Sequence, residues 1–150
     1  SMGGWIALLM VQRMVERIAA LITIAAAPDF TEDGFWNRFS EQQKSEIMEN
    51  GMIFLPSEYG EPYPITRRLI EDGRNHLILR SSFQVDFPVC MLQGDKDQSV
   101  TRETALRLFD HLEGEDIHLS FLKGGDHSLS SPENLAVLEN RLKTLIERLG

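Results

Sequence analysis

A serine, an aspartate and a histidine stand in three separate glycine-containing segments of the chain, in that order. The segments read Ser1-Met2-Gly3-Gly4, Gly94-Asp95-Lys96-Asp97-Gln98-Ser99-Val100 and Gly124-Gly125-Asp126-His127-Ser128. A serine hydroxyl becomes nucleophilic when an imidazole takes its proton, and a carboxylate on the other ring nitrogen fixes the tautomer and stabilises the imidazolium. These residue types in this order indicate nucleophilic catalysis. Ser1 would attack, His127 would act as base and acid, and Asp97 would orient the imidazole.

Strands and helices must bring these segments together. Short apolar runs at 18–25, 89–93 and 117–122 predict strands. Helical patterns at 4–14, 102–112 and 132–149 predict the helices around them. Strands joined through helices are parallel with right-handed crossovers, so their carboxyl ends meet at one edge.

Asp97 and His127 lie just past such strand ends, and Ser1 joins them if the residues before it formed another parallel strand. We therefore expect the three side chains to face one cleft. The backbone amide of Met2, at the start of a helix, is the predicted oxyanion donor. Gly3 and Gly4 are expected to let that helix approach the sheet closely.

Residues 29–85 interrupt this pattern with aromatic, charged and proline-punctuated sequence, which predicts an insertion. Within it we expect helices at 41–50, where Ser40 and Gln43 form a capping-box signature, and at 66–76. The residues Pro56, Gly60, Pro62 and Pro64 predict an irregular loop.

Length and composition favour one soluble α/β domain. The chain has 150 residues, of which 42% are hydrophobic, and a formal net charge of -8, which argues against a nucleic-acid partner. Cys90 is the single cysteine, so no intramolecular disulfide is expected. No apolar run is long enough to span a bilayer, so stable membrane insertion is not expected, and we predict a cytoplasmic location. No metal-ligand spacing links His76, His111 and His118, so no metal site is predicted.

The three segments resemble the second half of an α/β-hydrolase, whose nucleophile turn often reads Gly-x-Ser-Met-Gly-Gly and whose acid loop often reads Gly-x-x-Asp-x-x-Val. Residues 56–59, 70–74 and 126–127 add a narrower resemblance to small acyl-protein thioesterases and acyl-ester hydrolases. The resemblance implies a partial α/β-hydrolase fold with a helical lid at 29–85 and the N-terminal strands absent. It also implies cleavage of small-molecule fatty acyl esters or thioesters, or acyl glucuronides, without a cofactor.

The resemblance further implies that aromatic residues of the lid bind the substrate, with Trp36, Phe54 and Tyr59 as candidates. Ordinary packing of the lid is the alternative for these three residues. Gln93 stands where many members of the family have histidine, a difference expected to change only a noncatalytic contact.

Several alternatives stay open from the sequence. Ser1-Met2 could be a serine left by tag removal followed by a start methionine. Asp95 is a rival acid two residues from Asp97, and His127 could only satisfy local backbone. The alternative function is an inactive fragment or interaction module that needs a complementary N-terminal segment. Such a chain, alone, is expected to form a homodimer through the open edge of strand 18–25.

Overall fold

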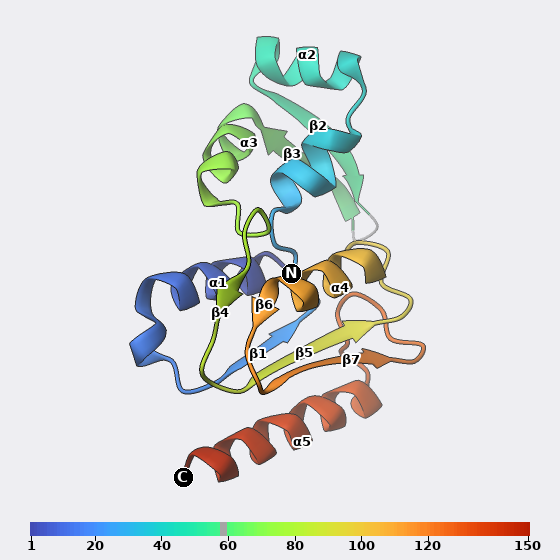
Figure 1. Cartoon of the computed structure of the whole chain (residues 1–150). Coiled ribbons are helices and arrows are strands. Elements are labelled where there is room, and N and C mark those ends of the chain that lie inside the picture. Colours follow the sequence, from blue (N-terminus) through green and yellow to red (C-terminus); the bar gives the residue numbers. More distant parts are fainter. Residues whose placement is uncertain (58–59) are drawn as a thin grey trace. The chain divides into compact units, whose positions relative to one another are not determined.

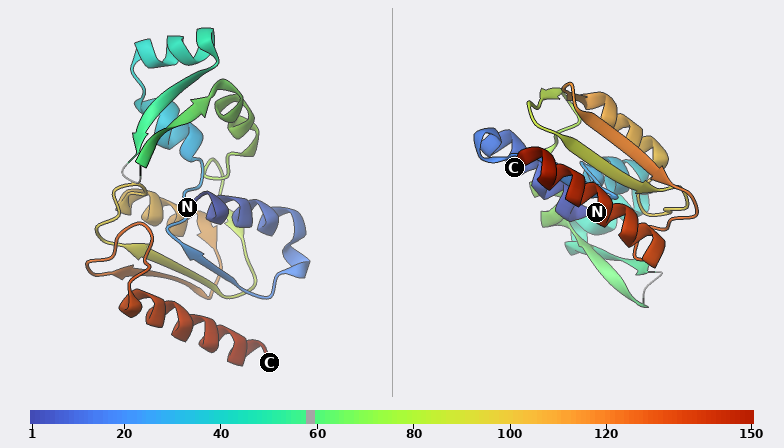
Figure 2. Two further views of the ribbon diagram at one scale, coloured as in Figure 1. Left: turned by 180° about the vertical axis from the view of Figure 1, so that it is seen from behind. Right: turned by 90° about the horizontal axis from the view of Figure 1, so that it is seen from below.

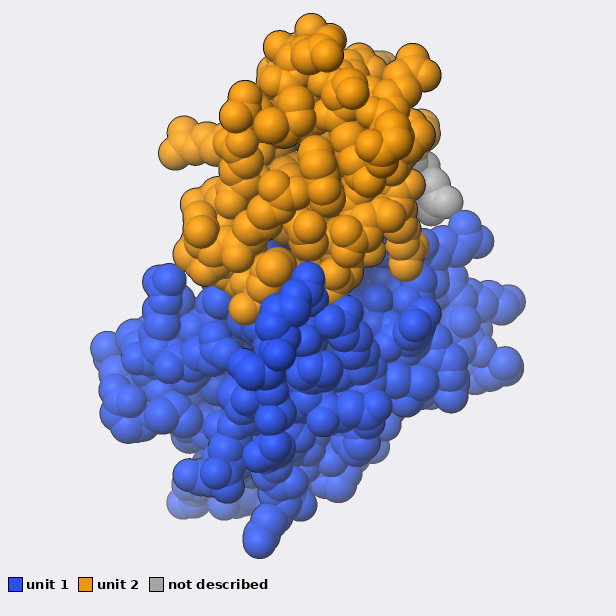
Figure 3. All heavy atoms as spheres, turned by 45° about the horizontal axis from the view of Figure 1, so that its top comes forward, with its two compact units in different colours: residues 1–28, 78–150 blue, residues 29–77 orange. Residues whose placement is uncertain are grey.

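The computed structural model describes residues 1–57 and 60–150, which divide into two compact units. One unit comprises residues 1–28 and 78–150, and the other comprises residues 29–77 (Figure 3). The predicted insertion at 29–85 contains the whole second unit, while residues 78–85 belong to the first.

A three-stranded parallel sheet forms the centre of the first unit. Its strands β1 (Leu21–Ile24), β5 (Val89–Gly94) and β7 (Ile117–Leu122) lie in the order β1-β5-β7. Leu21 pairs with Val89, which pairs in turn with Ile117. All six residues of the central strand β5 are buried, as expected for an apolar strand covered on both faces. The predicted α/β class with parallel strands is confirmed.

Helices cover both faces of this sheet. Figures 1 and 2 show α1 (Met2–Met14) and α4 (Arg102–His111) on one side and α5 (Pro132–Leu149) on the other. The hydroxyl of Thr101 accepts the Thr104 backbone amide at the start of α4, and Ser131 caps α5 in the same way. A 3₁₀ turn at Val15–Arg17 follows α1.

The start of α1 lies unusually close to the segment after β1. A Cβ atom added to Gly4 would be 2.7 Å from Ala26 Cβ, whereas one added to Gly3 would meet nothing within 4 Å. The carbonyl of Ser1 accepts the amides of Gly4 at 3.0 Å and Ala27 at 3.1 Å. Only Gly4 therefore provides the close approach that was expected of both glycines.

The second unit has its own small core. Its elements are a π-helix (Phe30–Phe35), a 3₁₀ turn (Trp36–Arg38), α2 (Glu41–Asn50), β2 (Met52–Ser57), β3 (Gly60–Thr66), α3 (Arg67–Gly73) and a second 3₁₀ turn (Arg74–His76). The buried residues at its centre are Phe39, Ile47, Ile53, Ile65 and Ile70. The Ser40–Gln43 capping box forms in full, and Gly51, with a φ of 82°, ends α2.

The prediction of an irregular loop is wrong for the described residues, because Pro56 lies in β2 and Gly60, Pro62 and Pro64 lie in β3, and these two strands pair in antiparallel fashion. Proline removes a backbone donor, which is tolerated on the open edge of a strand or at a bulge. Each strand of a two-stranded ribbon has one open edge, and the register shift lies between Leu55 and Ser57, at Pro56. Prolines are therefore compatible with this sheet.

Two further strands escaped sequence analysis because each is only two residues long. They are β4 (Phe83–Gln84) and β6 (Leu112–Glu113), which pair in parallel in the first unit. Among the described residues, no helix combines the length and apolar character needed to cross a membrane.

Candidate active site

Asp97 and His127 are joined by a hydrogen bond of 2.9 Å between Asp97 Oδ2 and His127 Nδ1. Asp97 follows β5 and His127 follows β7, and these strands are parallel neighbours. The Asp97 side chain is 0% exposed and that of His127 is 21% exposed. The strand ends thus bring an imidazole and a fully buried carboxylate together.

The Asp97 carboxylate receives three further hydrogen bonds. Its Oδ1 accepts the backbone amides of Ser99 and Val100, each at 2.8 Å, and its Oδ2 accepts Gln93 Nε2 at 2.8 Å. Donors to an ionised acceptor make comparatively strong and directional bonds. The carboxylate is therefore held in one orientation, with Oδ2 toward the imidazole.

Hydrogen bonds from backbone amides hold together the loops that carry Asp97 and His127. The amide of Lys96 donates to the carbonyl of Gly125 at 2.9 Å, and the amide of Gly124 donates to Asp95 Oδ1 at 2.5 Å. A Cβ atom on Gly94 would collide with the carbonyl oxygens of Gly125 and Asp126. Glycine at position 94 therefore lets the two loops meet.

Asp95, the rival acid, points to a different partner. Its carboxylate pairs with Lys123 Nζ at 2.7 Å, and this hydrogen bond, followed by that from Gly124, lowers the pKa of Asp95. Asp95 thus ties the acid loop to the histidine loop, while Asp97 contacts the imidazole. Asp126 accepts the amides of Ser128 and Leu129 and so shapes the turn after His127.

Ser1 lies at the same sheet edge. Its amino group donates to the carbonyl of Ile24, the last residue of β1, at 3.1 Å. Among the described residues, Ser1 Oγ makes no hydrogen bond to His127. Met2 is the first residue of α1, so its backbone amide belongs to the unpaired first turn of that helix.

The candidate substrate-binding residues belong to the second unit. Two cations lie over the Trp36 ring, Arg74 at 4.7 Å and Lys44 at 5.8 Å from its centroid. Phe54 is 63% exposed, and Tyr59 lies outside the described residues. The contacts of Trp36 are those of a packed side chain, and a substrate-binding role for these residues stays a prediction.

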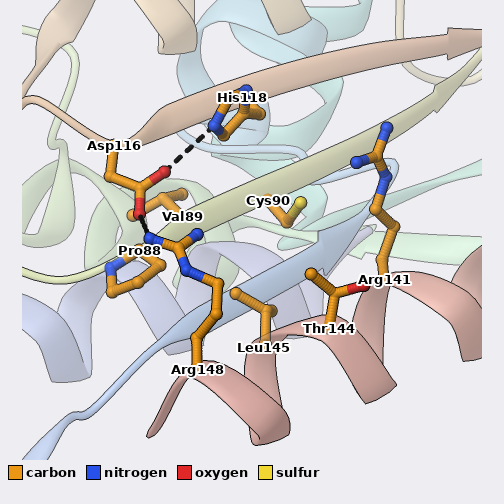
Figure 4. A pocket seen from close by; sticks show the side chains of 9 residues that line it. All are labelled: Pro88, Val89, Cys90, Asp116, His118, Arg141, Thr144, Leu145 and Arg148. Atoms are coloured by element: carbon orange, nitrogen blue, oxygen red, sulfur yellow. Dashed lines mark hydrogen bonds and ion pairs between the residues drawn. The ribbon is translucent and has the colours of Figure 1, made fainter.

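A small pocket of about 60 Å³ lies at the opposite ends of the strands (Figure 4). It is lined by Pro88, Val89, Cys90, Asp116, His118, Arg141, Thr144, Leu145 and Arg148. Asp116 bonds both His118, at 3.0 Å, and Arg148. Burial raises the pKa of the Cys90 thiol. Val89 begins β5 and Asp116 directly precedes β7, whereas Asp97 and His127 follow the other ends of these strands. The pocket is therefore separate from the Asp97–His127 pair.

The described residues contain no group of three His, Cys, Asp or Glu side chains able to hold a metal ion.

The whole chain aligns with known hydrolases. A palmitoyl-protein thioesterase, the mitochondrial ABHD10 of Rattus norvegicus, is 32% identical over 152 residues, covering 100% of this chain and 51% of that protein. The structure of a candidate hydrolase from Agrobacterium vitis S4 has a TM-score of 0.92 and 37% identity, over 97% of this chain and 59% of that one. Mouse α/β-hydrolase domain-containing protein 10 has a TM-score of 0.88 and 28% identity, over 98% of this chain and 59% of that one.

This chain belongs to the α/β-hydrolase superfamily. It spans about half the length of the curated relatives it matches, and its three central parallel strands with flanking helices form part of the α/β-hydrolase fold. No family model matches the sequence.

In this α/β-hydrolase chain, the sequence did not lead us to expect the hydrogen bond between Gln93 and Asp97. We expected the difference at this position to change only a noncatalytic contact, yet the Gln93 amide touches the same Asp97 oxygen as His127. A signal was present in the sequence, because a polar side chain inside an otherwise apolar strand must find a hydrogen-bond partner.

Proposed function

We propose that the protein is a serine hydrolase of acyl esters or thioesters, with Ser1, His127 and Asp97 as its catalytic residues. The observation that carries the proposal is the hydrogen bond between Asp97 Oδ2 and His127 Nδ1 at the carboxyl ends of β5 and β7. Asp97 uses one ring nitrogen, so the other, Nε2, is the nitrogen that would exchange protons with the nucleophile.

In the proposed reaction, His127 Nε2 takes the proton of the Ser1 hydroxyl as Ser1 Oγ attacks the acyl carbonyl carbon. The buried Asp97 carboxylate stabilises the resulting imidazolium. The imidazolium then protonates the departing alcohol or thiol, which leaves an acyl-serine. Water, deprotonated by the same imidazole, hydrolyses this ester and restores the hydroxyl. The Met2 amide, in the first turn of α1, would donate to the oxyanion.

The relatives support the type of substrate. The rat relative is named a palmitoyl-protein thioesterase, which favours acyl esters and thioesters as the class to test here. No cofactor is needed for the reaction as written. The predicted cytoplasmic location is a separate proposal, and because that relative is named mitochondrial, fractionation of cells that express the protein should test it.

The test uses p-nitrophenyl esters of increasing acyl length and a fluorophosphonate probe. The enzyme should be the chain together with whatever sequence its gene encodes on either side. We expect His127→Ala to lower kcat by about 10⁶-fold and Asp97→Asn by about 10⁴-fold, and Ser1→Ala to abolish labelling. The matched control is His118→Ala, since the His118 side chain is 62% exposed and lies on the same strand that leads to His127. Normal turnover by the His127 variant would reject the proposal.

A second candidate function is that of an interaction module that must join a complementary segment or a second copy before it becomes active. It is favoured by the exposed apolar side chains along α5, which are Leu135, Leu142, Ile146 and Leu149, each 43% to 60% exposed. Sedimentation and mass spectrometry of the 150-residue chain should then show dimers or a second polypeptide. Robust hydrolysis by the monomeric 150-residue chain would exclude this candidate.

A further inference from the structure

Gln93 is a buried polar side chain in the central strand of the sheet. It is 1% exposed, and its neighbours in β5 are apolar apart from the glycine that ends the strand. A primary amide in such surroundings loses its hydrogen bonds to water, which is costly unless protein groups replace them. The hydrogen-bond partners of Gln93 therefore explain how a buried, apolar strand can accommodate this polar side chain.

Those partners all belong to the acid loop, residues 94–100. Gln93 Nε2 donates to Asp97 Oδ2 at 2.8 Å and to the carbonyl of Val100 at 3.1 Å, with a longer contact of 3.4 Å to the carbonyl of Gly94. A carboxylate and a carbonyl only accept hydrogen bonds, so the amide nitrogen, and not the amide oxygen, must face them. Both N–H groups of Gln93 are thus engaged by the loop that carries Asp97.

We propose that Gln93 is a positioning residue that holds the Asp97 carboxylate toward His127. This inference rests on the proposed function of the Asp97–His127 pair. Gln93 and His127 share Asp97 Oδ2, while the amides of Ser99 and Val100 hold the other oxygen. With Gln93 in place, both carboxylate oxygens are fixed even before the imidazole donates.

The expected consequence of losing this amide concerns catalysis more than substrate binding. Asp97 Oδ2 must stay directed at Nδ1 while His127 carries its extra proton, because that is when the carboxylate stabilises the imidazolium. Without Gln93, His127 is the only donor among the described residues that remains hydrogen-bonded to Asp97 Oδ2. Partners that orient metal ligands change metal affinity or activity by about 10- to 100-fold when removed, and Gln93 orients Asp97 in a comparable way. We expect a decrease of that size in kcat, with little change in KM.

The test compares three variants by two measurements. Gln93→Met keeps the length of the side chain and removes the donor, and Gln93→His offers a ring N–H in place of the amide. Thr23→Val is the matched control, because Thr23 is 4% exposed on the adjacent strand β1 and its hydroxyl has no hydrogen-bond partner among the described residues. If Gln93→Met is unfolded by circular dichroism, Gln93→Asn replaces it, since its shorter amide cannot reach Asp97.

The first measurement is the proton NMR resonance of His127 Nδ1–H in the 150-residue chain, assigned by its loss in Asp97→Asn. We expect it to be sharp in the parent and in Thr23→Val, broadened by solvent exchange in Gln93→Met, and restored in Gln93→His. The second is steady-state hydrolysis by the protein used to test the proposed function.

An unchanged Nδ1–H resonance and unchanged kcat in the folded donor-less variant would overturn the inference. Equal losses in Thr23→Val and Gln93→Met would also overturn it, because they would indicate general damage to the sheet. The NMR measurement needs no turnover, so it tests the positioning role even if the Ser1 and His127 variants disprove the hydrolase proposal.

Discussion

Gly4→Ala should destabilise the protein, although alanine favours helices over glycine. The added Cβ would lie 2.7 Å from Ala26 Cβ and 2.9 Å from Ala26 Cα. Carbon atoms in good contact are about 3.5–4.0 Å apart, so the start of α1 must move by about 1 Å from the segment after β1. The helix cannot move freely, because the Ser1 carbonyl is held by the Ala27 amide.

Two opposing effects set the magnitude. Alanine in a helix gains up to about 1 kcal/mol over glycine. Overpacking of a well-packed contact costs about 1–3 kcal/mol, and here the atoms that collide are short and close to the backbone, so the upper part of that range applies. The net loss in the free energy of unfolding should be about 1–2 kcal/mol. For a chain of this size, that lowers Tm by about 2–8 °C.

The assay is thermal and urea unfolding followed by circular dichroism, with Gly3→Ala as the matched control. A Cβ on Gly3 meets nothing within 4 Å, so this variant keeps only the gain in helix propensity and should be at least as stable as the parent. We expect Gly4→Ala to lower the free energy of unfolding and Gly3→Ala to leave it unchanged or raise it. If Gly4→Ala proved as stable as Gly3→Ala, the close approach of α1 to Ala26 would be refuted.

Three other results can be anticipated. Ser40→Ala should lower the free energy of unfolding by about 1 kcal/mol because it removes the hydroxyl that accepts the Gln43 amide, whereas Ser45→Ala on the exposed side of α2 should change little in the same urea titration. The hydrogen bond from Arg148, followed by that from His118, lowers the pKa of Asp116 from its ordinary value. The stabilisation of the fold by the ionised Asp116 is therefore present at neutral pH and is lost as the pH falls through the lowered pKa. Asp116→Asn should therefore flatten the acid side of the stability profile, and an unchanged slope would contradict the pairing. Gly94→Ala should separate the two site loops and remove the His127 Nδ1–H resonance, and a retained resonance would show that the loops can adjust.

Much of the fold follows from local sequence signals. The hydroxyls of Ser40, Thr101 and Ser131 mark the first turns of α2, α4 and α5, because each accepts an amide that the helix leaves unpaired. The three parallel strands were equally visible as apolar runs. The β2–β3 hairpin was not, because its prolines carry the opposite local preference and only pairing between the strands shows that they sit where no donor is needed.

The candidate site, like the fold, could be predicted from the sequence only in part. That Asp97 and His127 lie near each other could be anticipated, since loops after neighbouring parallel strands meet at one edge. The spacing Gly-x-x-Asp-x-x-Val favoured Asp97 over Asp95 as the partner of the imidazole, but the role of Asp95 could not be predicted, because its partners Lys123 and Gly124 come from the opposite loop. The catalytic roles of Ser1, Asp97 and His127 stay predictions until the variants are assayed.

The hydrogen bonds between the two site loops restrict how the lengths of these loops could change during evolution. The amides of Lys96 and Gly124 each reach across to the facing loop, in fixed register with Gly125 and Asp95. Inserting one residue between Asp95 and Lys96, or between Gly124 and Gly125, would change the spacing on which both hydrogen bonds depend. Changes of length at these two points should therefore arise as compensating pairs in related genes, while the β2–β3 hairpin, in its own compact unit, is free of that restriction.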